Sequence, residues 1–280
     1  MNTVNIRMIA MDLDGTLLKN DHRSISKASV RTIDAAHNNH IACTVATGRI
    51  FSIIPHQVRA ISDIDWSVTS NGAVLYDNRL YDSKEPSLTD GTYVDIHGAE
   101  RLLRNIPQST WIEMWSCGKI YVGRRQWEHM DAYSLRPLHV QALLQIGKVV
   151  DDLQQLIDDK MPIEKINFPS IDKTAQEVVM KDLLDSRLYS FIPMREGLEV
   201  MGARVSKEHG IQRLCTALGI GLENVMAIGD SENDIEMLEA CGMGIAMGNA
   251  LDEVKDAADH VTLSNEDDGL ALAIERYALN

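Results

Sequence analysis

The chain has 280 residues, of which 45% are hydrophobic and 24% are charged, so an intrinsically disordered protein is excluded and two domains are possible. The formal net charge of -14 at pH 7 argues against binding to nucleic acid or anionic membranes, because both carry negative charge themselves. The four cysteines form no C-x-x-C pair, and no signal peptide or bilayer-length apolar span is apparent. We therefore expect a cytoplasmic protein that is a monomer or a weak homo-oligomer.

The first predicted strand ends in a pair of carboxylates. The apolar run Met8–Met11 leads into Asp12 and Asp14, and Gly15 marks a sharp turn. Residues i and i+2 of an extended segment point the same way, and adjacent like charges cost free energy unless a cation or proton lies between them. The pair therefore indicates a metal site or an acid/base pair. An ordinary Asp-Gly turn is the alternative, whereas a calcium loop is disfavoured because the chain continues Thr-Leu-Leu-Lys.

Residues 7–82 alternate strand and helix patterns. A helix is predicted from a capping region at Ser24–Ser26 through Ala36, followed by an apolar strand over Ile41–Ala46. This order predicts a parallel sheet, and ligands bind at the carboxyl ends of the strands in such sheets. Thr47 stands at that end of the second strand, where its hydroxyl suits either a helix cap or a phosphate group.

A third strand is predicted at Trp66–Thr69, directly before Asn71-Gly72. Asn-Gly is typical of a hairpin turn, so Asn71 has a structural explanation that needs no ligand. Its place after a strand of the predicted parallel sheet also puts it near the other strand ends. Asn71 is therefore a candidate for both roles.

The character of the sequence changes after residue 82. A polar stretch with a proline, residues 83–87, is typical of a linker, and no catalytic motif follows it up to about residue 192. Within this segment, helices are predicted near residues 98–106, 149–160 and 173–185, and strands at Trp111–Trp115, Lys119–Val122 and Ile163–Phe168. The predicted domains are a core in two segments, 1–82 and 193–280, and an inserted α/β unit, 83–192.

The last segment contains two further polar features. A strand at Leu198–Met201 precedes a helix that opens with Lys207, where a cation opposes the helix dipole. The apolar strand Val225–Ile228 ends in the acidic cluster Gly229–Asp234. Capping of the helix that follows needs only one residue of this cluster.

Four segments together resemble the motifs of the haloacid dehalogenase-like phosphohydrolases. They are DLDGTLL at residues 12–18, ATGR at 46–49, VSK at 205–207 and GDSENDIEML at 229–238, and MGIAMGNA at 243–250 is similar to members of the Cof-type subfamily. The resemblance implies a doubly wound, Rossmann-like α/β core and an inserted α/β cap that closes over the active site and selects the substrate. Glu208 departs from the family pattern, in which a glycine usually follows the lysine.

The same resemblance implies the roles of individual residues. Asp12 would attack the phosphorus, and Asp14 would act as general acid and base while its backbone carbonyl binds Mg2+. Asp234 would orient its loop or Lys207 rather than touch the ion. The implied sets are catalytic Asp12, Asp14 and Lys207; phosphate-binding Thr47, Gly48, Asn71 and Asn233; and metal-binding Asp12, Asp14 and Asp230.

The function implied is a Mg2+-dependent phosphatase that hydrolyses small phosphorylated metabolites, sugar phosphates first, through an aspartyl phosphate. A phosphomutase or phosphotransferase would use the same intermediate and pass the phosphoryl group to another hydroxyl. A non-catalytic phosphate-binding regulator is a further alternative, although it would not need both Asp12 and Asp14. A signalling receiver domain also phosphorylates an aspartate, but it needs neither the second aspartate nor an inserted unit of this size.

Overall fold

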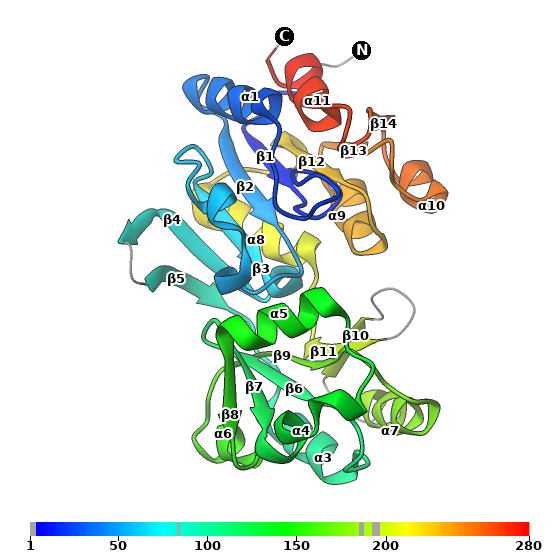
Figure 1. Cartoon of the computed structure of the whole chain (residues 1–280). Helices are drawn as coiled ribbons and strands as arrows, with labels where there is room; N and C mark the ends of the chain where they lie inside the picture. The colour runs from blue at the N-terminus through cyan, green and yellow to red at the C-terminus, as the bar shows by residue number, and fades with distance from the viewer. Residues whose placement is uncertain (1–3, 83–84, 185–187, 192–196, 280) are drawn as a thin grey trace. The chain divides into compact units, whose positions relative to one another are not determined.

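A computed structural model of the chain describes residues 4–82, 85–184, 188–191 and 197–279. They form two compact units, one of Met1–Asp90 with Ser206–Asn280 and the other of Gly91–Val205 (Figure 1). The boundaries predicted at 82/83 and 192/193 fall at residues outside the described ranges. The boundaries between the two compact units, at 90/91 and 205/206, both lie later in the chain than these predictions. We describe the two units separately, as the core unit and the second unit.

The core unit contains an eight-stranded sheet among its described residues, in the order β14-β13-β12-β1-β2-β3-β4-β5. All neighbouring pairs from β14 to β3 are parallel, and β4 returns antiparallel to β3. The sheet therefore has the doubly wound arrangement that the sequence predicts. The strands are β1 (Met8–Met11), β2 (Ala42–Ala46), β3 (Trp66–Thr69), β4 (Val74–Asp82), β5 (Glu85–Gly91), β12 (Val225–Gly229), β13 (Met243–Ala246) and β14 (His260–Val261).

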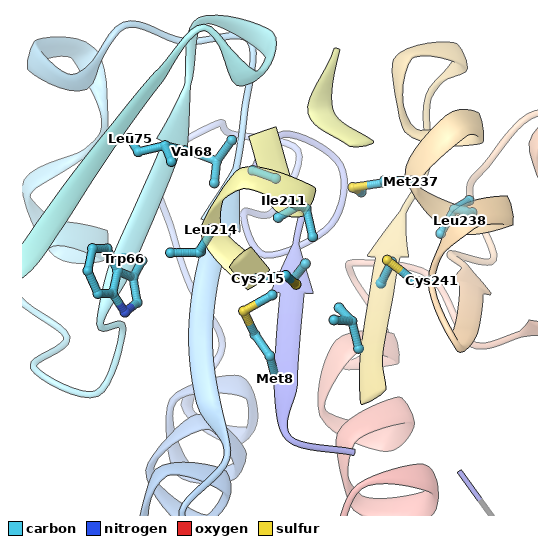
Figure 2. Packing of buried hydrophobic residues seen from close by; sticks show 14 of the residues in the cluster. Met8, Trp66, Val68, Leu75, Ile211, Leu214, Cys215, Met237, Leu238 and Cys241 are labelled. Carbon is cyan, nitrogen blue, oxygen red and sulfur yellow. The ribbon is translucent and has the colours of Figure 1, made fainter. Parts of the chain in front are cut away.

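Helices cover both faces of this sheet (Figure 1). On one face, α8 (Lys207–Leu218) and α9 (Ile235–Ala240) pack against each other and against the strands. Figure 2 shows Ile211 and Leu214 of α8 in the same buried cluster as Met8 and Val68 of the strands. Side chains alternate along a strand, so Ile9 and Met11 point to the other face. That face is covered by α1 (Lys27–Asn38) and α11 (Gly269–Tyr277).

Helix α1 begins where its capping sequence predicts. The Ser26 hydroxyl accepts a hydrogen bond from the backbone N–H of Ser29 at 3.0 Å, which satisfies one donor of the first turn. The short helices of the core unit are α2 (His56–Arg59) and α10 (Asp252–Asp256), and its 3-10 turns are Phe51–Ile53, Ser70–Gly72, Leu222–Asn224 and Glu232–Asp234.

The second unit is built on a six-stranded sheet in the order β10-β11-β9-β6-β7-β8, antiparallel except for the pair β7 and β8. Helices α3, α6 and α7 enclose a hydrophobic core with one face of this sheet. Its elements are α3 (Ile96–Asn105), β6 (Glu113–Ser116), β7 (Lys119–Gly123), α4 (Arg124–Glu128), a 3-10 turn (Met130–Ala132), α5 (Pro137–Ile146), β8 (Gly147–Val150), α6 (Gln154–Asp158), β9 (Ile163–Phe168), α7 (Lys173–Leu184), β10 (Leu188–Phe191) and β11 (Leu198–Gly202).

Two predictions for the segment 137–202 are wrong. The helix predicted at 149–160 is the strand β8 followed by the short α6, because Asp152 accepts the backbone N–H of Gln154 at 2.8 Å and starts a new helix there. Strand β11, which we expected in the core, pairs with β9 in the second unit. Its alternation of buried Leu198 and Val200 with the charged Glu199 suits an antiparallel sheet with two different faces.

None of the helices within the described residues has the length and the apolar composition needed to span a bilayer.

Candidate active site

The turn after β1 is shaped by Gly15. Asp12 follows the strand, and the backbone N–H of Leu18 donates to the carbonyl of Leu13 at 2.8 Å, which closes the turn. Gly15 has φ +83°, a left-handed conformation that disfavours other residues. A Cβ at this position would also lie 2.2 Å from Oδ2 of Asp230. The left-handed turn therefore favours glycine, and a larger residue would also displace the side chain of Asp230.

A buried lysine connects the first and the last motif. Lys207 is the first residue of α8, whose start is fixed by the Ser206 hydroxyl accepting the N–H of His209 at 3.2 Å. Its Nζ donates to Oδ1 of Asp12 and to Oδ1 of Asp234, each at 2.6 Å. Burial alone would lower the pKa of Lys207, but the two carboxylates raise it above its usual value. Lys207 is therefore a charged ammonium group at a site that excludes water.

Asp234 holds the loop after β12 in place. Its Oδ2 accepts the backbone N–H groups of Asp230 at 2.9 Å and of Ser231 at 3.0 Å. Together with the bond from Lys207, these contacts occupy both carboxyl oxygens. Asp234 therefore contacts both the loop and Lys207, the two groups that its predicted role concerns.

Among the described residues around Asp12 and Asp230, carboxylates outnumber the single ammonium group of Lys207. Burial and the nearby carboxylates of Asp234 and Asp230 raise the pKa of Asp12 well above its usual value, despite Lys207. Burial and the charge of Asp234 raise the pKa of Asp230 to about 6. Crowded carboxylates of this kind are stabilised by a cation.

The donor set fits a hard divalent cation. Asp12, Asp230 and Asp234 each offer a carboxylate oxygen, and these oxygens lie within 4.8 Å of one another. Because both oxygens of Asp234 already accept hydrogen bonds, Asp12 and Asp230 are the side chains suited to bind the ion. Oxygen ligands are typical of Mg2+ and Ca2+ sites.

Asp14 lies in an ion-pair network that the sequence did not predict. The guanidinium of Arg49 donates from Nε to Oδ2 at 2.7 Å and from Nη2 to Oδ1, and Nδ1 of His22 lies 2.8 Å from Oδ1. Burial would raise the pKa of Asp14, but these partners lower it. In this arrangement Asp14 is an ionised carboxylate directed toward Arg49. Arg49 could have been suspected only because it belongs to the ATGR segment. Nothing in the amino-acid sequence pointed to His22 as a partner of Asp14.

The predicted phosphate-binding residues lie at neighbouring strand ends. Asn71 has φ 54° and donates its backbone N–H to the carbonyl of Thr47 at 3.0 Å, and its Oδ1 accepts Nδ2 of Asn233 at 3.0 Å. A Cβ on Gly48 would lie 2.9 Å from the same Oδ1. The fold thus brings Gly48, Asn71 and Asn233 together, with Thr47 beside them.

Comparison with known proteins identifies the family of the chain. A family model described as haloacid dehalogenase-like hydrolase matches residues 9–274. Phosphatase YwpJ of Bacillus subtilis (strain 168) is 29% identical over 95% of this chain and 98% of its own length. From the same organism, the 5-amino-6-(5-phospho-D-ribitylamino)uracil phosphatase YcsE is 27% identical over 99% of this chain and 97% of its own.

A solved structure of a haloacid dehalogenase-like hydrolase from B. subtilis superimposes with a TM-score of 0.77 and 28% identity, covering 97% of this chain and 99% of that one. The similarity therefore extends over both units and is not restricted to the motifs. The chain belongs to the haloacid dehalogenase-like hydrolases, within their Cof-type phosphatases.

Proposed function

We propose that the protein is a Mg2+-dependent phosphatase that hydrolyses small phosphorylated metabolites, sugar phosphates or similar monoesters, through an aspartyl phosphate on Asp12. The observation that carries the proposal is the contact of the buried ammonium of Lys207 with Asp12 at 2.6 Å. A carboxylate attacks a phosphate dianion only when negative charge is offset, and a charged lysine at the nucleophile supplies part of that offset. Mg2+ held by Asp12 and Asp230 would supply the rest of the positive charge.

The first step transfers the phosphoryl group to the protein. A carboxylate oxygen of Asp12 forms a bond to phosphorus as the ester oxygen leaves with its electron pair and takes a proton from Asp14. The Thr47 hydroxyl accepts the backbone N–H of Arg49 at 3.1 Å, so its own hydrogen is directed elsewhere and suits a phosphate oxygen. Asn233 uses one amide hydrogen on Asn71 and has a second one to donate.

The second step returns Asp12 to its starting form. Asp14 takes a proton from a water molecule, whose oxygen bonds to phosphorus while the bond to Asp12 breaks, which releases inorganic phosphate. For either step Asp14 must leave the guanidinium of Arg49, because a carboxylate with a lowered pKa in an ion pair has no proton to donate and is a weak base. The pairing with Arg49 and His22 therefore corresponds to a resting arrangement.

We further propose that the second unit is a cap that decides which esters are used. All residues assigned to the chemistry lie in the core unit, and they recognise only groups that every phosphomonoester shares. The second unit has a polar sheet face, with Glu113 and Asn167 buried on the side opposite its hydrophobic core. Replacing exposed residues on that side of the sheet should change the order of preferred substrates, whereas Arg124→Ala, which alters an exposed ion pair, should not.

The experiment is a phosphate-release screen over p-nitrophenyl phosphate and a panel of sugar phosphates, phosphoglycolate and phosphorylated ribityl compounds, with Mg2+ or with EDTA. We expect multiple turnovers with Mg2+, loss of release in EDTA and no release by Asp12→Asn. Transfer of phosphate to an added alcohol in place of release would indicate a phosphotransferase. Full activity of Asp12→Asn would contradict the proposal.

A further inference from the structure

Asn249 joins the two loops that carry the predicted metal ligands. It lies in the loop after β13, which is adjacent to β12 in the sheet. Its Nδ2 donates to the backbone carbonyl of Gly15 at 2.9 Å and lies 3.3 Å from Oδ2 of Asp230. One amide group thus contacts both the turn after β1 and the carboxylate after β12.

The orientation of this amide is fixed by a third loop. The backbone N–H of Asn265 donates to Oδ1 of Asn249 at 3.0 Å, so the NH2 group must face Gly15 and Asp230. Asn265 is itself buried, and its Nδ2 donates to the carbonyl of Leu18 at 2.9 Å and to Oδ1 of Asn20 at 3.1 Å. Through the backbone N–H and the side chain of Asn265, a chain of hydrogen bonds therefore links residues 18–20 to Asn249 and to the carboxylate of Asp230.

Asn249 contacts the two loops at a point where they lie close together. A Cβ on Gly15 would lie 2.2 Å from Oδ2 of Asp230, and the hydroxyl of Thr16 lies 3.5 Å from Oδ1 of the same carboxylate. An amide suits this position because it donates a hydrogen bond without neutralising the carboxylate. A lysine or arginine there would compete with a bound cation for the same charge.

We propose that Asn249 is a positioning residue that fixes the Asp230 carboxylate against the turn after β1 and so sets the affinity of the site for its cation. The inference rests on the metal dependence proposed above. Asn249 contacts neither Asp12 nor Lys207 among the bonds found in the described residues, so it acts through Asp230 and takes no part in the transfer itself.

The test compares Asn249→Ala with Asn38→Ala, a matched control in which an exposed asparagine of α1 loses a bond to Asp34. Melting temperature is measured against Mg2+ concentration for both variants and for the wild type. Asn249→Ala loses three hydrogen bonds, so we expect the metal-free variant to melt somewhat below the wild type, and the quantity compared is the Mg2+ dependence of the shift from each protein's own metal-free value. The Mg2+ concentration for half of the shift should rise roughly 10- to 100-fold in Asn249→Ala and stay unchanged in Asn38→Ala.

Steady-state kinetics give a second readout. At low Mg2+, Asn249→Ala should lose activity, and at saturating Mg2+ its kcat should return to within a few-fold of the wild type. An unchanged half-saturation in Asn249→Ala, with a wild type that responds to Mg2+, would overturn the role of Asn249 and leave the proposed function standing. A wild type without any response to Mg2+ would overturn both.

Discussion

At the scale of single residues, the ammonium of Lys207 lies between two buried carboxylates, 2.6 Å from an oxygen of Asp12 and of Asp234. All three side chains are almost completely buried, so water cannot compensate for the loss of any one of them. The same contacts that hold Asp12, the proposed nucleophile, therefore also stabilise the core unit.

Replacing Lys207 with Met should abolish activity and lower the free energy of unfolding by about 3–5 kcal/mol, because two buried carboxylates lose their partner. Urea unfolding at pH 7 measures the loss. The double variant Lys207→Met with Asp234→Asn removes one of the orphaned charges, so it should be more stable than the single variant. Equal stability of wild type and Lys207→Met would show that the ion pairs of Lys207 with Asp12 and Asp234 do not stabilise the fold.

The positions of the strand ends were sufficient to predict that Asp12 and Asp230 lie at one edge of the sheet, since parallel strands put their carboxyl ends there. They were not sufficient for Lys207, which was predicted from the family resemblance, because the strand before it belongs to the sheet of the second unit. Nor were they sufficient for the pairing of Asp14 with Arg49. These residues are 35 positions apart, and which charged partner a side chain selects depends on rotamers and distances that periodicity does not encode.

At the scale of elements, Glu113 of β6 is the polar centre of the second unit. Its carboxylate is fully buried and accepts bonds from the indole N–H groups of Trp111 at 2.7 Å and Trp115 at 2.9 Å, and from Asn167 at 2.9 Å. Nε2 of His139, from α5, lies 2.6 Å from it. Burial alone would raise the pKa of Glu113, but His139 and the other donors lower it.

A lowered pKa in the folded state means that ionised Glu113 stabilises the second unit. This contribution is complete above the unfolded value of about 4.3 and is lost as pH falls through the lower folded value. Glu113→Gln should cost about 2–4 kcal/mol at pH 7, because its NH2 group meets other donors. The difference between wild type and variant, measured by urea unfolding from pH 7 to pH 3, should shrink only below about pH 4.3. A difference that is constant with pH would contradict the assignment.

The elements themselves were predicted unevenly. Strand β9 has the bounds that the alternating sequence predicts, and α3 and α7 lie close to their predicted places. The failure at β8 and α6 arises because residues 149–160 contain apolar positions compatible with both periods, and a short strand cannot be distinguished from a helix by pattern alone. Tertiary pairing with β7 decides the outcome.

At the scale of the whole molecule, much of the negative charge is concentrated late in the chain. From Glu223 to Asn280 there are fourteen acidic residues against Lys255 and Arg276. Part of this excess lies in the site, where Asp230 and Asp234 face Asp12. A cation that binds only the folded protein should therefore stabilise it.

Mg2+ at about 100 times its dissociation constant should add about 2.7 kcal/mol to stability and raise the melting temperature by roughly 5 °C. Differential scanning calorimetry with and without EDTA measures the shift. Asp230→Asn should abolish most of it. An unchanged melting curve at millimolar Mg2+, combined with full activity in EDTA, would exclude a hard-cation site.

The most direct test of the account is to find the phosphoryl group on Asp12. The Asp14→Asn variant lacks the base for the second step, whereas p-nitrophenolate leaves without needing a proton, so the phosphorylated protein should accumulate with p-nitrophenyl phosphate. Borohydride reduces an aspartyl phosphate to homoserine, and cleavage by trypsin after Arg7 and Lys19 yields the peptide Met8–Lys19 for sequencing by mass spectrometry. We predict homoserine at position 12, only when the substrate and Mg2+ are present. An unmodified Asp12 in a variant that still releases p-nitrophenolate, or modification at another residue, would contradict the account.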